Sequence, residues 1–328
     1  MANVKKKTIN PLNENHKSPS IIIANHQSFL DILSLVMLHP KFILLTNHWV
    51  WNSPIFGLVV QMADYLKAQD AEINIPFLKE KIKEGYSIVI FPEGTRSFDG
   101  QMKRFHKGAF LLAEQLDVDI LPIVLHGTGY CMSKGDFLLK NGQITIEYLP
   151  RILITNMDYG ITYQEKTKNI SKYFKQKYID LAAQIEDVNY FHDQLIGNYI
   201  LKGPVLEWYM RIKLKLEKNY KFMDEIIPLK NNILDIGCGY GFLDYYLAFR
   251  SSHRSISALD FDVEKISIAS NGYLRPSNLT FETANILEYQ MKCYDTIIIS
   301  DVLHYLNDHQ QNEILESCIK ALNPNGQL

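Results

Sequence analysis

The sequence has few cysteines, no long apolar run and no excess of charge of either sign. Its four cysteines, Cys131, Cys238, Cys293 and Cys318, form no C-x-x-C pair, which indicates a reduced, cytosolic protein without a structural zinc site. Lys and Arg number 34 against 36 Asp and Glu, so the overall charge gives no case for nucleic-acid binding. No apolar run of about 18 residues could span a bilayer, and no signal peptide is recognisable. We therefore expect a soluble or peripheral protein.

What is present is enough apolar sequence for two cores. The chain has 328 residues, of which 47% are hydrophobic, and this length favours two domains of about 100–200 residues each. Short β-branched runs alternate with helical patterns over residues 20–150, which is typical of an α/β domain. A polar, helical segment follows, and a second α/β unit begins at Asn232. We expect an α/β domain at 1–157, a helical connector at 158–224 and a partial α/β domain at 225–328.

The elements of the first domain follow from this alternation. Strands are expected at 21–23, 42–45, 87–91, 120–125 and 144–148. Helices are expected at 28–38, 77–84 and 107–116.

A histidine follows the first predicted strand, and an aspartate comes five positions after it, in the sequence N-H-Q-S-F-L-D at residues 25–31. Asp31 can hold one imidazole nitrogen of His26 protonated, so that the other nitrogen accepts a proton from a substrate hydroxyl. The hydroxyl itself then attacks, and no Ser, Cys or Lys nucleophile is needed. A surface histidine followed by a helical aspartate fits this spacing equally well.

A second polar motif, F-P-E-G-T-R-S at residues 91–97, follows the third predicted strand. A proline and Gly94 predict a tight turn, which places Glu93, Thr95 and Arg96 at the end of a strand, where α/β proteins place their sites. The planar, permanently charged guanidinium suits a phosphate or a carboxylate. The alternative is a Glu–Arg ion pair that ties down a loop.

Together, the two motifs resemble those of the glycerophosphate/lysophospholipid acyltransferase family. The first block of that family is N-H-x-x-x-x-D, and its block F-P-E-G-T-R-S is matched here at every position. Shorter stretches resemble further blocks: P-I-F-G at 54–57, F-H-K-G-A at 105–109 and L-P-I at 121–123. The resemblance covers about residues 18–152 and implies an acyl donor that is a thioester on CoA or acyl carrier protein. It also implies that His26 is the general base, that Asp31 orients it, and that the acceptor is bound by Glu93, Gly94, Thr95 and Arg96.

One position departs from the family pattern. The second block of the family ends in an arginine that helps to bind a phosphorylated acceptor, whereas the best match here, A-D-Y-L-K-A at 63–68, ends in Ala68. Lys67 could supply a point charge but not a bidentate fork. Since a charge-assisted hydrogen bond contributes about 1.5–3 kcal/mol, this loss favours a phenol or another non-phosphorylated alcohol over glycerol phosphate or lysophosphatidate.

The second candidate site is a strand that opens into glycines, N-I-L-D-I-G-C-G-Y-G at residues 232–241. Gly237 and Gly239 permit positive φ and the close approach of a ligand, and the N-terminus of a helix follows. A strand at 256–259 then ends in Asp260, 21 positions after Gly239. An acidic residue at that distance can hydrogen-bond the hydroxyls of a ribose.

This pattern resembles class I S-adenosylmethionine-dependent methyltransferases more closely than dinucleotide sites, which carry G-x-G-x-x-G. Methyl transfer mainly needs alignment of the reacting groups; His304 could act as a base, or it could be a packing histidine. The resemblance implies S-adenosylmethionine as cofactor, with its methionine part at Asp235, Gly237 and Gly239, its ribose at Asp260 and its adenine at Asn285 and Ile286.

The sheet of that family has seven strands, and the chain ends at Leu328, before the expected fifth strand. We therefore expect the fourth strand, at the start of residues 294–304, to be an exposed edge, and the residues 322–328 to form a turn. Fusions of an acyltransferase with a methyltransferase also look like parts of larger bacterial proteins with an exporter-type membrane region, some of them associated with aryl-polyene or related lipid-pigment synthesis.

The sequence thus predicts an O-acyltransferase α/β domain, a helical connector and an incomplete Rossmann-like methyltransferase sheet. The expected partners are an acyl thioester and a hydroxyl acceptor, with no metal and no nucleic acid, in the cytoplasm or at the inner face of the membrane. The basic stretch at 211–221 could contact anionic lipid, where each Lys or Arg contributes about 1 kcal/mol, or it could be a solvated helix face. Two alternatives remain: a 1-acylglycerol-3-phosphate acyltransferase beside an unrelated methyltransferase domain, and a non-catalytic binding or scaffold fragment.

Overall fold

The structure is a computed structural model. It describes residues 3–46, 66–67, 74–97, 102–135, 138–217 and 219–328. The chain forms two compact units, Met1–Gln184 and Ile185–Leu328.

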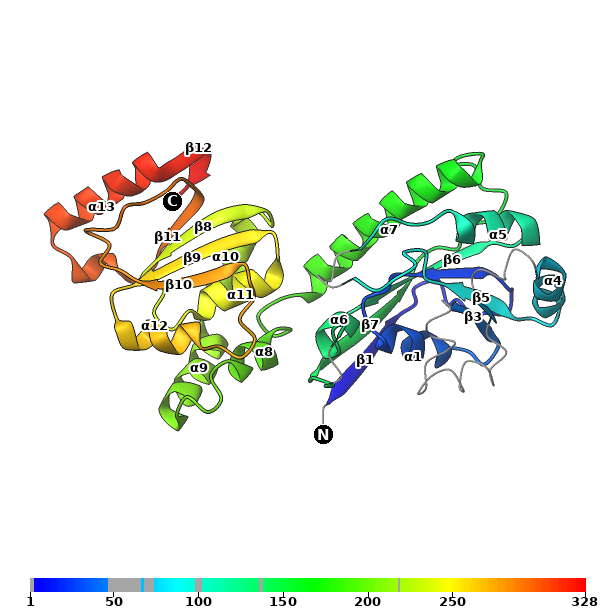
Figure 1. The fold of residues 1–328 in the computed structure, drawn as a ribbon, viewed down its shortest axis with the longest axis horizontal. Coiled ribbons are helices and arrows are strands. Elements are labelled where there is room, and N and C mark those ends of the chain that lie inside the picture. Colours follow the sequence, from blue (N-terminus) through cyan, green and yellow to red (C-terminus); the bar gives the residue numbers. More distant parts are fainter. Residues whose placement is uncertain (1–2, 47–65, 68–73, 98–101, 136–137, 218) are drawn as a thin grey trace. The chain divides into compact units, whose positions relative to one another are not determined.

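The first unit is built on one seven-stranded sheet (Figure 1). Its strands lie in the order β1-β7-β6-β2-β5-β3-β4, and neighbouring strands are parallel except β6 and β7. The central strand β2 consists of three isoleucines and an alanine, all fully buried, because helices and loops cover both faces of the sheet. The strands are β1 (Val4–Ile9), β2 (Ile21–Ala24), β3 (Phe42–Thr46), β4 (Leu66–Lys67), β5 (Ser87–Ile90), β6 (Ile120–His126) and β7 (Gly142–Tyr148).

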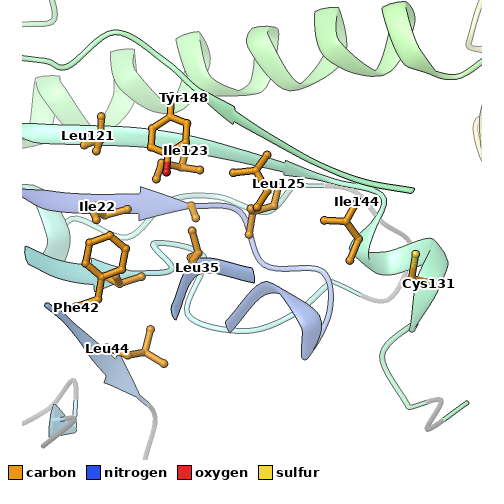
Figure 2. Packing of buried hydrophobic residues seen from close by; sticks show 13 residues of the cluster. Ile22, Leu35, Phe42, Leu44, Leu121, Ile123, Leu125, Cys131, Ile144 and Tyr148 are labelled. Carbon is orange, nitrogen blue, oxygen red and sulfur yellow. The ribbon is translucent and has the colours of Figure 1, made fainter. Parts of the chain in front are cut away.

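Five helices of this unit flank the sheet among the described residues. They are α1 (Leu30–Val36), α4 (Ile75–Lys83), α5 (Gly108–Leu116), α6 (Thr128–Cys131) and α7 (Tyr163–Ile185). Figure 2 shows the core on one face of the sheet, where Leu35 of α1 meets Ile22, Leu121 and Ile123 of the central strands. The five strands and three helices predicted between residues 20 and 150 are confirmed.

The strand β1 was not predicted, because its sequence V-K-K-K-T-I lacks an apolar pattern. It pairs with β7 in parallel at the edge of the sheet. The three lysines are exposed and only Val4 and Ile9 are partly buried. Lysines on an edge strand oppose pairing with other chains. The three lysines that made this strand hard to predict are therefore appropriate at the edge of the sheet.

The second unit has a five-stranded parallel sheet in the order β10-β9-β8-β11-β12. The order reverses between β8 and β11, as in doubly wound Rossmann-like sheets, in which ligands bind at that reversal. The strands are β8 (Asn231–Ile236), β9 (Arg254–Asp260), β10 (Leu279–Thr283), β11 (Tyr294–Ile299) and β12 (Leu322–Gln327). Beside them lie α11 (Phe242–Arg250), α12 (Val263–Ser270), the 3-10 helix η1 (Leu303–Tyr305) and α13 (Asp308–Ala321).

The prediction that β11 is an exposed edge is wrong, because β12 pairs with it. The turn predicted for residues 322–328 is also wrong, because residues 322–327 continue α13 as the strand β12 (Figure 1). Two side-chain bonds support the irregular pairing: Asn323 Nδ2 donates to Asp295 Oδ1 at 2.7 Å, and Gln327 Nε2 donates to Thr296 Oγ1 at 3.1 Å.

The segment predicted as a connector is helical, as expected, but the boundary between the units falls inside it. The helix α7 belongs to the first unit, and three further helices belong to the second: α8 (His192–Gly197), α9 (Pro204–Leu216) and α10 (Asn219–Ile226). Tyr199, which follows α8, is buried and donates through its hydroxyl to the carbonyl oxygen of Tyr240 at 2.6 Å. Asp224 of α10 accepts from Arg250 at 2.7 Å and from the fully buried Arg254 at 2.5 Å.

In the part of the chain that the structure describes, every helix is too short or too polar to cross a membrane.

Candidate functional site

The loop that follows β2 brings His26 and Asp31 together. His26 Nδ1 lies 2.9 Å from Asp31 Oδ2, and the same oxygen accepts the backbone N–H of Gln27 at 2.6 Å and of Ser28 at 2.7 Å. Asp31 is fully buried, whereas the His26 side chain is 14% exposed. When the Nδ1 proton is donated to Asp31, Nε2 is left as an acceptor. The His26 ring also stacks on Phe91, with ring centroids 4.1 Å apart.

The turn at residues 91–97 is joined to this loop by Glu93. Glu93 Oε1 accepts the backbone N–H of His26 at 2.7 Å, and Oε2 accepts that of Lys103 at 2.7 Å. The backbone N–H of Ser97 donates to the carbonyl of His26 at 3.0 Å. Burial raises the pKa of Glu93 to about 7, although the two N–H donors act in the opposite direction. In this structure Glu93 holds the two loops together, and neither of its bonds is an ion pair with Arg96.

The rest of the turn is more open than Glu93. Gly94 and Thr95 are exposed and Arg96 is half-buried. Gly94 adopts a φ of +70°, which side chains with a Cβ rarely adopt, so a glycine suits this position.

Two lysines that the sequence reasoning missed lie against this turn. Lys134 Nζ donates to the carbonyl oxygen of Arg96 at 3.0 Å and approaches Thr95 Oγ1 at 3.5 Å, and Lys103 Nζ donates to the same carbonyl at 3.2 Å. Burial, Lys103 and Arg96 together lower the pKa of Lys134. We call Arg96, Lys103 and Lys134 the cation cluster. No motif marks Lys134, which lies 38 positions from Arg96. The signal for Lys103 is only its closeness to the turn in sequence.

The P-I-F-G stretch at 54–57 and Ala68 lie outside the described residues, as does the side chain of Lys67.

In the second unit, the loop after β8 presents its backbone at the reversal of strand order. Gly237 and Gly239 have φ values of +80° and +57°. A Cβ at Gly237 would lie 2.1 Å from Val302 Cγ2, whereas a Cβ at Gly239 would meet nothing within 4 Å. Close packing therefore requires a glycine at the first position, and the second faces open space that a ligand can approach.

Asp260 lies at the end of β9 and shapes this loop. Its Oδ2 accepts the backbone N–H of Gly239 at 2.8 Å, and its Oδ1 accepts that of Asp262 at 2.9 Å. Each carboxylate oxygen has a second lone pair, so Asp260 keeps the capacity to accept hydroxyl donors. Open space at Gly239 beside an acceptor carboxylate fits the ribose and methionine portions of S-adenosylmethionine.

The predicted adenine residues lie in the loop after β10, and the backbone N–H of Ala284 joins this loop to the Asp260 carbonyl at 3.0 Å. Asn285 is exposed and donates to Glu288 Oε1 at 3.1 Å, while Ile286 is partly buried against the core. His304 is exposed in η1 and lies against Tyr305, with ring centroids 4.0 Å apart. The structure thus gathers the predicted residues at one edge of the sheet.

The sequence reasoning missed a buried acid beneath the glycine loop. Asp244 of α11 is fully buried, and its carboxyl group lies within hydrogen-bonding reach of the carboxyl group of Asp235 in β8, which is 4% exposed. Burial raises the pKa of Asp235 to about 7; the charge of Asp260 adds to this rise, whereas the hydrogen bond with Asp244 opposes it. Burial raises the pKa of Asp244 further, and the charge of Asp235 acts in the same direction. The sequence signal that could have indicated this buried acid is the position of Asp244 inside the apolar stretch F-L-D-Y-Y-L at 242–247.

Among the described residues, no group of three or more His, Cys, Asp or Glu side chains could hold a metal ion.

Comparison with known proteins assigns both units. Residues 3–126 match the family model described as Acyltransferase, and residues 233–326 match the model described as Methyltransferase domain. The chain joins an acyltransferase domain to a methyltransferase domain.

The acyltransferase domain has curated relatives in plants and algae. The chloroplastic 1-acyl-sn-glycerol-3-phosphate acyltransferase LPAT1 of Arabidopsis thaliana is 38% identical over 135 residues, which are 39% of this chain and 38% of the relative. A 1-acyl-sn-glycerol-3-phosphate acyltransferase of Chlamydomonas reinhardtii is 37% identical over 134 residues, 39% of this chain and 40% of the relative. The chain spans about two fifths of the length of these relatives.

Solved structures of both kinds are also similar. The 1-acyl-sn-glycerophosphate acyltransferase PlsC of Thermotoga maritima is 22% identical, with a TM-score of 0.46, and the match covers 55% of this chain and 72% of that one. An S-adenosylmethionine-dependent methyltransferase of Mesorhizobium loti is 21% identical, with a TM-score of 0.30, over 34% of this chain and 52% of that one.

Proposed function

We propose that the acyltransferase domain moves an acyl group from a CoA or acyl-carrier-protein thioester to the hydroxyl of a lipid-like acceptor. His26 Nε2 takes the proton from the acceptor hydroxyl while its oxygen attacks the thioester carbonyl. The tetrahedral intermediate then collapses, the carbon–sulfur bond breaks, and the departing thiolate takes the proton from His26. The observation that carries this proposal is the 2.9 Å contact between His26 Nδ1 and the buried Asp31, which orients the ring and stabilises the imidazolium that forms.

Different observations favour two classes of acceptor. The cation cluster supports an acceptor with an anionic group, since Lys103 and Lys134 both contact the backbone carbonyl of Arg96 and the charge of Arg96 acts on Lys134. The curated relatives are named as 1-acyl-sn-glycerol-3-phosphate acyltransferases, which supports the same class. We therefore infer an anionic, phosphorylated acceptor. Ala68, in place of the arginine of the family, is the observation that favours the second class, a phenol or other non-phosphorylated alcohol.

A matched pair of acceptors decides between these classes. 1-Oleoyl-lysophosphatidate and 1-oleoylglycerol carry the same acyl chain and differ in the phosphate. With an acyl-CoA donor, release of free thiol measures turnover of each. Robust turnover of lysophosphatidate alone supports the anionic class, and turnover of 1-oleoylglycerol alone contradicts it. If neither the turnover of these acceptors nor thioester hydrolysis depends on His26, the domain is a non-catalytic binding or scaffold fragment.

For the methyltransferase domain we propose that it binds S-adenosylmethionine along the loop after β8. Asp235, Gly237 and Gly239 would bind its methionine part. Asp260 would bind its ribose, and Asn285 with Ile286 its adenine. When bound, the cofactor supplies an electrophilic methyl group to an acceptor nucleophile. Titration calorimetry with S-adenosylmethionine tests this assignment, and absence of heat from the folded protein contradicts it.

We also propose that the chain works in the cytoplasm at the inner face of a membrane. The four cysteines are free, which suits a reducing compartment. A lipid-like acceptor would have to be reached at a bilayer surface.

A further inference from the structure

The helix α9 has two apolar faces, and only one of them is buried. Leu206, Met210 and Leu214 recur every four residues and are buried in the methyltransferase unit. With about 3.6 residues per turn, Val205, Trp208 and Leu216 fall on roughly the opposite side. Their exposed fractions are 79%, 64% and 69%. A helix of a soluble domain needs one apolar stripe to attach it, so the second stripe has no role in the core.

The turn before α9 carries a further exposed apolar side chain. Leu201 is 95% exposed and adopts a φ of +72°, which is a strained conformation for a bulky side chain. The residues on either side hold the turn in place. Tyr199 donates to the Tyr240 carbonyl at 2.6 Å, and Lys202 Nζ donates to the Asn271 carbonyl at 3.1 Å. The exposed leucine is therefore presented by a fixed turn.

Basic side chains border the outer stripe on both sides. On the helical wheel Lys213 lies along one border, and Arg211 and Lys215 lie along the other. Residues 200–217 carry four basic and two acidic side chains, whereas the whole chain has a net charge of −2. Glu207 pairs with Arg211 at 2.7 Å and Glu217 approaches Lys213 at 3.9 Å, which leaves an excess of positive charge at this helix.

We propose that this surface docks onto an anionic lipid bilayer. We define it as the α9 face: Leu201, Val205, Trp208 and Leu216, bordered by Lys213 and Lys215. A bilayer offers apolar depth for the stripe and negative headgroups for the basic borders, and tryptophan favours the interface between them. This goes beyond the proposed acyl transfer, because it gives the methyltransferase unit its own attachment to the membrane.

Vesicle binding by the full chain tests the proposal. Co-sedimentation is measured with vesicles of phosphatidylcholine alone and of phosphatidylcholine mixed with phosphatidylglycerol. We expect V205E/W208E to lower partition onto the anionic vesicles by about tenfold or more. The matched control is I319E, an exposed apolar residue of α13, because α9 and α13 lie at opposite margins of the unit (Figure 1). It should bind as the natural chain does, and far-UV circular dichroism checks that both variants are folded.

A second measurement reports on the helix itself. The chain has three tryptophans, so W49F/W51F leaves Trp208 as the only tryptophan, and vesicles with brominated acyl chains should quench its emission strongly. Binding without quenching overturns the proposal, as does equal binding by V205E/W208E. A dimer in sedimentation velocity that V205E/W208E abolishes, with no vesicle binding, shows a contact between copies and overturns it too. His26→Ala should bind vesicles normally, which separates this outcome from failure of the proposed acyl transfer.

Discussion

Glu93 accepts the backbone N–H of His26 at 2.7 Å, across 67 positions of sequence. This hydrogen bond joins the loop of the proposed general base to the turn that carries the cation cluster. The position of the imidazole therefore depends on a carboxylate that need not touch a substrate.

Replacing Glu93 by Gln should disturb this arrangement. Only one of the two backbone donors of Glu93 can be kept, because the amide nitrogen cannot accept the other. We expect a loss of about 1–3 kcal/mol in the free energy of unfolding and a fall in kcat that exceeds the change in KM. Urea unfolding and thiol release measure the two effects. Glu80→Gln, at an exposed position of α4, is the control and should change neither.

Asp31→Asn tests the orientation of the imidazole. An amide in place of the carboxylate no longer stabilises a charged ring, so we expect kcat to fall by about 10²–10⁴ with little change in KM. His26→Ala should remove the activity that depends on the base. Steady-state kinetics on a single thioester donor compare the two variants, and an Asp31→Asn enzyme with full kcat would refute the assigned role.

Lys134→Ala tests the cation cluster. Because Lys134 is partly exposed, we expect a modest rise of about 3–10-fold in KM for lysophosphatidate. The KM for 1-oleoylglycerol should not change. Lys83→Ala, an exposed lysine at the end of α4, is the matched control. An equal effect of Lys134→Ala on both acceptors would mean that the lysine only supports the turn.

The acid pair Asp235 and Asp244 makes the stability of the methyltransferase unit depend on pH. Burial raises both folded-state pKa values above those of the unfolded chain, that of Asp235 to about 7. The unit is therefore most stable below about pH 4, and its stability falls as the pH rises, up to about 7 on account of Asp235 and further on account of Asp244, whose pKa is raised more. Asp244→Asn should flatten this decline and stabilise the unit at pH 8 by at least about 1.4 kcal/mol, which equals one pKa unit. Chemical unfolding at pH 5 and pH 8 checks this, and parallel declines in both proteins would contradict it.

Two glycines of the cofactor loop should respond differently to alanine. Gly237→Ala forces a methyl group against Val302 and should destabilise the unit by more than about 2 kcal/mol. Gly239→Ala meets open space and should cost only the strain of its positive φ, about 1 kcal/mol, while it weakens S-adenosylmethionine binding. Thermal unfolding and calorimetry separate the effects. Unchanged affinity in Gly239→Ala would place the ligand elsewhere.

Local patterns in the sequence predicted the elements and contacts that form between residues close together in the chain. The β-branched runs gave the central strands, and the short spacing between His26 and Asp31 predicted their meeting. The strand β12 was missed because its proline and glycine are turn residues, whereas the bonds from Asn323 and Gln327 to β11 depend on tertiary structure.

The residues missed at the sites share the same cause. Lys134 reaches Arg96 only through the fold, and the burial of Asp244 follows from how α11 packs on β9. Both effects arise between residues far apart along the chain, and single-sequence patterns do not report them.

The hydroxyl of Tyr199 and the carbonyl of Tyr240 bear on how this protein can be divided and recombined. The family match of the methyltransferase begins at residue 233. The glycine loop, however, is held by the hydroxyl of Tyr199, which lies 34 positions before that residue. A module that keeps this support must therefore begin before Tyr199, for example at Ile185, where the second unit starts. A shuffled copy cut at residue 225 would carry the cofactor motif without the side chain that holds it.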